Sequence, residues 1–88
     1  MAETKPTIKV EVRSRQGLVF SGDLVAVSSF NLTGPFDVLA EHTNFVSMIK
    51  KKLVLHRSDG RSEEINVDNG VIIVENNSVK VFIGVGKM

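Results

Sequence analysis

The sequence predicts an all-β fold, a flattened antiparallel β-sandwich of about eight to ten short strands. Short apolar runs separated by turn residues recur along most of the 88 residues. Nowhere do apolar residues recur at helical spacing over ten residues or more. The apolar residues make up 42% of the chain and are mainly Val, Ile, Leu and Phe, with no Trp or Tyr, which also favours strands over helices. A chain of this length supports one core, so we expect a single domain.

We expect this domain to cover residues 7–88, with residues 1–6 as a flexible leader. The leader is largely polar, and Pro6 disfavours a helical conformation at Lys5. The first strand is predicted at residues 8–13, where apolar and charged side chains alternate and so occupy opposite faces. The alternating residues are Ile8, Lys9, Val10, Glu11, Val12 and Arg13.

Further apolar runs predict the other strands, and the residues between them predict the turns. These strands are expected at residues 18–20, 24–27, 36–39, 45–49, 53–56, 64–67, 70–75 and 79–83. The segments 58–60, 68–70 and 76–78 contain Asn, Asp or Gly, which tolerate the positive φ of tight hairpin turns. Residues 28–35 are rich in turn formers and are expected to form a loop. Residues 50–52, three consecutive lysines, are interpreted as a solvated turn, with a contact to an anion or an acidic partner as the alternative.

Charge and composition exclude several classes of function. Eleven basic and ten acidic residues give a net charge of +1, too little to attract nucleic acid or an anionic membrane to the chain as a whole. The absence of Cys excludes a disulfide framework and a thiolate metal site. No apolar run is long enough to cross a bilayer, and there is no secretory signal. We therefore expect a soluble chain with no metal, no cofactor, no nucleic-acid partner and no direct membrane insertion.

Candidate catalytic residues are few. His42 and His56 are the only histidines, so a zinc site would have to recruit scattered carboxylates. Glu41 precedes His42, but neighbours on a strand point to opposite faces and no nucleophile can be assigned to them. We interpret His42 as a surface contact and keep a small hydrolase built on these two residues as a third hypothesis. Glu63 and Glu64 are also neighbours on a predicted strand, so their carboxylates point apart and do not form the pair that glycoside hydrolysis uses. Residues 84–87 lack the spacing of a phosphate-binding loop.

Four motifs in a fixed order carry a family resemblance. They are Val19-Phe20-Ser21-Gly22, Gly-Pro-Phe-Asp-Val-Leu-Ala-Glu-His at 34–42, Phe-Val-Ser-Met-Ile-Lys at 45–50, and Glu-Glu-Ile-Asn-Val-Asp-Asn-Gly-Val-Ile-Ile-Val at 63–74. Residues 8–86 resemble the N-terminal β-sandwich domain of the epsilon subunit of F-type ATP synthases. In that family the second motif reads Gly-Glu-Phe/Leu-Gly-Ile/Val-Leu/Tyr-Pro-Gly-His, and the spacing from Gly34 to His42 matches it without a gap.

The resemblance implies a function. The chain would be a non-catalytic central-stalk subunit that docks on the gamma subunit and the membrane rotor ring and couples ion-driven rotation to ATP synthesis. It would lie at the cytoplasmic face of the bacterial inner membrane, carry no cofactor or nucleotide, and be monomeric when isolated. The residues at matched contact positions or in the matched loop, and so expected at partner interfaces, are Ser14, Gly34, Phe36, Glu41, His42 and Ser47.

Departures from the family pattern support a second hypothesis, a free-standing β-sandwich adaptor no longer part of the synthase. Pro35 replaces an acidic residue, Asp37 replaces Gly, and Ala40-Glu41 replaces Pro-Gly before the histidine. The sequence also lacks the C-terminal helical hairpin that inhibits ATP hydrolysis and binds ATP in the family, so the resemblance implies that this chain does neither. Whether the hairpin was removed or never existed, and whether protons or sodium drive the assembly, stay open from the sequence.

Overall fold

The computed structural model describes residues 6–84, and these form seven strands and no helix. The strands are β1 (Ile8–Ser14), β2 (Gly17–Leu24), β3 (Ala26–Asn31), β4 (Gly34–Leu39), β5 (Phe45–His56), β6 (Ser62–Glu75) and β7 (Ser78–Ile83). The all-β prediction is confirmed, but the predicted eight to ten short strands are wrong. Most of the predicted leader, and residues 85–87 of the segment compared with a phosphate loop, lie outside the described residues.

The strands form one hydrogen-bonded sheet in the order β2-β1-β7-β6-β5-β3-β4. Every neighbouring pair is antiparallel except β1 and β7, which run parallel. The sheet is therefore mixed, which corrects the prediction of a purely antiparallel one. Local turn signals predict hairpins between consecutive strands, whereas a parallel pair is joined by a long crossover that leaves no local signal. Here the whole chain between β1 and β7 forms that crossover.

The lysine run is not a turn, because β5 continues through it. The pairing of β5 with β6 shifts register between Ile49 and Lys51, and Lys51 has a φ of 74°. This combination is a β-bulge, which bends a strand without ending it. The two strands predicted at 45–49 and 53–56 are thus the two halves of β5.

The strands predicted at 64–67 and 70–75 are likewise one strand, β6, because the hairpin turn expected at 68–70 is absent. Gly70 lies inside β6 and is not among the glycines with positive φ. A Cβ atom at this position would lie 2.6 Å from the carbonyl oxygen of Phe82 and 3.2 Å from Cγ1 of Ile49. The residue is glycine because two neighbouring strands approach it closely, so β6 runs unbroken over both predicted strands.

Other turn predictions fare differently. Asn76 and Asn77 have φ values of 51° and 63°, which are typical of the tight turn that joins β6 to β7. The predicted turn at 58–60 is also present, closed by a hydrogen bond from the Gly60 amide to the Arg57 carbonyl of 3.1 Å. The loop predicted at 28–35 is wrong, because most of it belongs to β3 and β4, which are joined by a two-residue turn.

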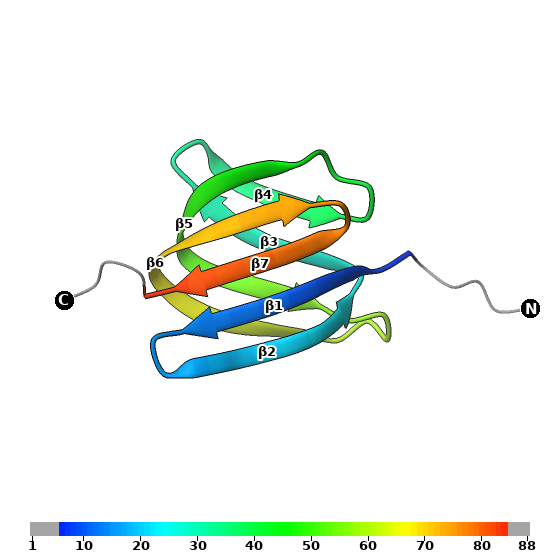
Figure 1. Cartoon of the computed structure of the whole chain (residues 1–88), viewed down its shortest axis with the longest axis horizontal. Coiled ribbons are helices and arrows are strands. Elements are labelled where there is room, and N and C mark those ends of the chain that lie inside the picture. Colours follow the sequence, from blue (N-terminus) through cyan, green and yellow to red (C-terminus); the bar gives the residue numbers. More distant parts are fainter. Residues whose placement is uncertain (1–5, 85–88) are drawn as a thin grey trace, which may run out of the picture.

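The sheet folds over itself into two layers (Figure 1). One layer contains β2, β1, β7, the second half of β6 and the first half of β5; the other contains the remaining halves of β6 and β5 with β3 and β4. Alternate residues of both layers point inward, as predicted for β1. They form one core: Ile8, Val10, Val12, Leu24, Val27, Val38, Ile49, Leu53, Leu55, Val67, Ile72, Val74, Val79 and Val81.

Candidate protein-interaction surfaces

The two histidines occupy separate places, and neither belongs to a metal cluster. His42 lies in the β4–β5 loop, where its Nδ1 is 2.7 Å from the carbonyl oxygen of Thr43. A carbonyl can only accept, so this nitrogen carries a proton. His56 ends β5, far along the chain. Residues 6–84 contain no group of three side chains suited to hold a metal ion.

His56 does lie beside a serine and an aspartate, but not in the arrangement of a catalytic triad. The Ser28 Oγ atom is 2.5 Å from Oδ1 of Asp37 and 2.9 Å from Nε2 of His56. In a triad the histidine stands between the serine and the carboxylate. Here the hydroxyl lies between the other two groups and donates its one hydrogen bond to the Asp37 carboxylate. The His56 imidazole therefore cannot accept that proton as a base. The cluster links β3, β4 and β5 rather than activating a nucleophile.

Five of the six predicted interface residues lie along one side of the molecule, which we call the β4–β5 seam. At one end of the seam, Asn31 joins two of them: its Oδ1 accepts from the Gly34 amide at 3.1 Å, and its Nδ2 donates to Ser47 Oγ at 3.3 Å. In the middle, the rings of Phe36 and Phe45 meet edge to face, with centroids 5.7 Å apart. The seam is therefore a chain of contacts between the β3–β4 hairpin and the first half of β5.

The far end of the seam is the loop at 40–44, which contains Glu41 and His42. The His42 ring packs against Phe45 with centroids 5.0 Å apart. Glu41 has a φ of 65°, a conformation that costs an L-residue about 1–2 kcal/mol. The Glu41 amide donates to Oδ1 of Asn77 at 2.6 Å, and the Asn76 amide donates to the Asn44 side chain at 3.0 Å. Two asparagine side chains thus fasten this loop to the β6–β7 turn.

Ser14, the sixth predicted residue, does not join this group. It ends β1, and its Oγ atom accepts from the Gln16 amide at 3.1 Å within the β1–β2 turn. That turn and the loop at 40–44 lie at opposite ends of the molecule (Figure 1). If all six residues contact partners, they contact them over two surfaces.

A surface that the sequence reasoning missed lies on the outer side of β5, β6 and β7. Its apolar members, which we call the β5–β6–β7 face, are Val46, Met48, Val71, Ile73 and Phe82. They are contiguous because Val46 pairs with Ile73, and Met48 pairs with Val71, which in turn pairs with Phe82. Val46 is 67% exposed and Met48 is 63% exposed, while the other three are partly buried. A contiguous apolar area that is partly exposed is a candidate interaction site.

The signal for this face was present in the sequence. Residues 71–74 are four consecutive apolar residues, and a strand that is solvated on one face alternates instead. Because neighbours point to opposite sides, two of the four must face outward. Val46 and Met48, on either side of Ser47, likewise point to one face of their strand. An uninterrupted apolar run therefore predicts a strand that is covered on both faces once the protein has its partners.

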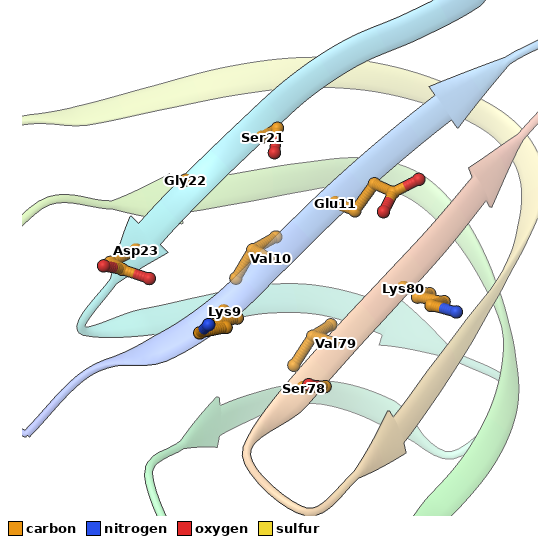
Figure 2. Close-up of a pocket in the computed structure, with 9 residues that line it drawn as sticks. All are labelled: Lys9, Val10, Glu11, Ser21, Gly22, Asp23, Ser78, Val79 and Lys80. Atoms are coloured by element: carbon orange, nitrogen blue, oxygen red, sulfur yellow. The ribbon is translucent and has the colours of Figure 1, made fainter.

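A hollow of about 390 Å³ lies across β2, β1 and β7. Figure 2 shows its lining residues on three strands, among them Ser21, Gly22 and Asp23 on β2 and Ser78 and Lys80 on β7. Its lining residues include no histidine, and the carboxylate of Glu11 is paired with Arg13. The lining is thus polar and charged, and three neighbouring strands contribute to it.

These features define a class of protein: a two-layer β domain whose described residues present an exposed apolar sheet face and an anchored polar loop. A family model described as the ATP synthase Delta/Epsilon chain β-sandwich domain matches residues 7–85. The chain belongs to this family.

Relatives of established name agree with the family match. The chain is 30% identical to the ATP synthase epsilon chain of Nitratiruptor sp. and 32% identical to that of Campylobacter fetus, in each case over 78 residues. Each match covers 88% of this chain and 60% of the relative. The chain thus spans about 60% of the length of these relatives. In its described part, no helix is long and apolar enough to cross a membrane.

Two solved structures show the same fold at low identity. One is the Euglena gracilis mitochondrial ATP synthase, with a TM-score of 0.82, 16% identity, and 92% of this chain and 53% of the other covered. The other is the central stalk and c-ring of the Tetrahymena thermophila mitochondrial ATP synthase, with a TM-score of 0.74, 10% identity, and coverage of 92% and 66%. These likenesses confirm the β-sandwich architecture.

Proposed function

We propose that the chain is a central-stalk subunit of an F-type ATP synthase that docks on the gamma subunit and the rotor ring. Docking would couple ion-driven rotation of the ring to ATP synthesis, and it would hold the chain at the cytoplasmic face of the bacterial inner membrane. The family match supports this proposal, as does the likeness to a chain in a central stalk and c-ring structure.

The observation that carries the docking step is the β5–β6–β7 face. Protein interfaces have an apolar core surrounded by polar residues, and this face has that composition: Val46 and Met48 project outward, with Lys50 next along β5 and Lys80 opposite Ile73 on β7. A stable interface buries about 1,200 Å² or more in total. We therefore assign gamma to this face and the neighbouring β4–β5 seam together, since five side chains alone are too small a surface.

Stiffness is the property that the coupling role requires of the domain. The sheet is continuous from β2 to β4, so any displacement of one layer must bend or break backbone hydrogen bonds. The loop at 40–44 is held by side chains from two asparagines rather than left to move freely. A domain of this kind transmits a lateral force from one surface to another with little deformation.

Co-purification tests the proposal. A tagged chain, expressed in a host related to those of its relatives, is recovered from detergent-solubilised native membranes and its partners are identified. We expect gamma and ring subunits with the unmodified chain and neither with the double variant Val46→Glu, Met48→Glu. Val19→Glu is the matched control, because Val19 is also an exposed apolar strand residue, at 45%, but lies on β2, outside both surfaces assigned to gamma. If the unmodified chain retains neither subunit, the proposal is wrong.

The second candidate function is the free-standing adaptor. The structure gives it one specific support: the altered residues Pro35, Asp37 and Glu41 all lie on β4 or in the loop that follows it, so these three departures from the family lie along one strand and its loop. In the same co-purification, recovery of a defined complex that lacks every synthase subunit would favour the adaptor. A gene placed away from the synthase genes would favour it as well.

A further inference from the structure

We propose that Glu75 and Lys50 set the direction in which gamma lies on the β5–β6–β7 face. The surface of gamma would then carry a basic side chain over Glu75 and an acidic side chain over Lys50. The direction of docking rests on the proposed function, because the same face has to meet gamma for the two charges to orient it.

Glu75 and Lys50 each continue an outward row of the face. On β6, Glu75 follows Ile73 by two positions, and on β5, Lys50 follows Met48 by two. Residues two apart on a strand point to the same side of the sheet. Both charged residues are exposed, so they stand at the margin of the apolar area rather than within it.

The two charges stand at opposite ends of the face. Phe45 pairs with Val74, which puts Glu75 level with position 44, six positions before Lys50 on β5. At about 3.3 Å per residue the two backbone positions are about 20 Å apart. Figure 1 shows the β6–β7 turn, which follows Glu75, and the bend of β5 at opposite ends of these strands. The Debye length at physiological ionic strength is about 8 Å, so the two charges act as separate poles.

Neither pole is neutralised within the part of the chain that the structure describes. The ion pairs among residues 6–84 involve neither Glu75 nor Lys50. Lys80, the diagonal neighbour of Glu75 on β7, also forms no ion pair with it. Glu41 and Lys51, both exposed, add a second charge of the same sign at each end. The rim is therefore acidic beside the loop at 40–44 and basic beside the bulge.

The apolar side chains alone do not fix a direction. Val46 and Met48 on β5 lie beside Ile73 and Val71 on β6, so a partner turned end to end would cover nearly the same aliphatic area. Apolar burial is non-directional. A reversed partner would instead bring like charges together at both ends, which disfavours the wrong arrangement. The proposed coupling role requires one direction, because the chain has to reach gamma and the rotor ring at the same time.

Association kinetics test the two poles. The unmodified chain and its variants bind to immobilised synthase of a related host from which the host's own epsilon chain has been removed. We expect Glu75→Lys and Lys50→Glu each to lower the association rate constant at least about threefold at low salt, with a smaller effect as salt rises. Attraction between net charges alone would make these two substitutions act in opposite directions. Asp23→Lys is the matched control for Glu75→Lys, because it changes the charge equally but is exposed on β2.

The outcomes separate the direction of docking from docking itself. If binding is lost in the double variant Val46→Glu, Met48→Glu but both charge reversals leave the rate unchanged, or change it in opposite directions, the polarity is wrong and docking stands. If the unmodified chain does not bind, the proposed function is wrong and the polarity falls with it. A free chain that is dimeric by light scattering, and monomeric as Lys50→Glu, would show that a second copy meets these poles instead of gamma. All substituted positions are exposed, and circular dichroism verifies that the variants fold.

Discussion

The side chain of Asn77 accepts a hydrogen bond of 2.6 Å from the backbone amide of Glu41, so the β6–β7 turn determines the position of the loop that contains His42. Both residues have positive φ, and each lies in a segment that sequence patterns identified for a different reason. The relationship connects the local chemistry of a tight turn to the rigidity of a candidate interface 36 residues earlier in the chain.

This hydrogen bond can be removed without disturbing the turn. In Asn77→Gly the backbone keeps its positive φ, which glycine adopts freely, but the acceptor for the Glu41 amide is lost. A hydrogen bond of this kind contributes about 0.5–1.5 kcal/mol net, so exchange of the Glu41 amide with deuterium should accelerate about two- to tenfold. Asn76→Gly is the control, because Asn76 contributes its backbone amide and not its side chain. Equal exchange in the two variants would contradict the anchoring role.

Gly70 provides a test of the packing between β5, β6 and β7. Gly70→Ala places a Cβ atom 2.6 Å from the Phe82 carbonyl oxygen, a backbone atom that cannot rotate away. We expect a loss of about 1–3 kcal/mol in the free energy of unfolding, measured by urea denaturation. Gly22→Ala is the matched control, since its Cβ would meet the flexible ring of Phe20 at 3.2 Å, and it should cost less. A neutral Gly70→Ala would show that the strands are more widely spaced.

Asp59 is expected to titrate at unusually low pH. Hydrogen bonds from the Arg61 backbone amide and then from the Arg61 side chain hold the pKa of this carboxyl below its ordinary value of 3.8. A pKa lowered by folding means that the carboxylate stabilises the turn above that ordinary value, and that the contribution is lost as pH falls through the folded pKa. NMR titration of the Asp59 side chain measures it directly. Arg61→Ala should raise the midpoint only in part, because the backbone donor remains; an unshifted wild-type midpoint would refute the prediction.

The Ser28 hydroxyl makes a prediction about the tautomer of His56. Because the hydroxyl donates its one proton to Asp37, the hydrogen bond to His56 requires a proton on Nε2 of the imidazole. Nitrogen-15 chemical shifts of the ring report which nitrogen is protonated in the neutral form. Ser28→Ala should release this tautomer preference and lower the free energy of unfolding by about 1–3 kcal/mol, whereas Ser21→Ala, an exposed serine of β2, should change neither. A neutral Nδ1-protonated ring in the unmodified protein would contradict the assignment.

Much of the fold follows from local patterns in the sequence. The alternation in β1 predicted which three of its residues are buried, and Asn76-Asn77 predicted a hairpin because both residues tolerate positive φ. The same reasoning failed at Gly70, because glycine serves both positive φ and close approach, and the sequence does not distinguish the two uses. It failed at Lys51 because a bulge lets charged neighbours face solvent within a strand, which resembles an exposed turn.

The candidate surfaces were predictable in part. The resemblance named Gly34, Phe36, Glu41, His42 and Ser47, and the structure places all five along the β4–β5 seam, although their role as contacts is still a prediction. Val46 and Met48 were overlooked because each is an ordinary strand residue when considered alone. They become part of a larger face by pairing with Val71 and Ile73 on β6; the apolar run at 71–74 indicates that β6 has an outward apolar side, but not which residues of β5 lie beside it.

Protection of a single engineered thiol tests the docking proposal at its most specific point. Met48→Cys and, as the control, Val19→Cys each introduce the chain's one cysteine, and both positions are exposed in the isolated domain. Alkylation rates are measured for the free chain and for the chain assembled with gamma and the rotor ring. We predict that assembly slows alkylation at position 48 at least about tenfold and leaves position 19 unchanged. If position 48 reacts equally fast in the assembled complex, the β5–β6–β7 face is not the surface that binds gamma.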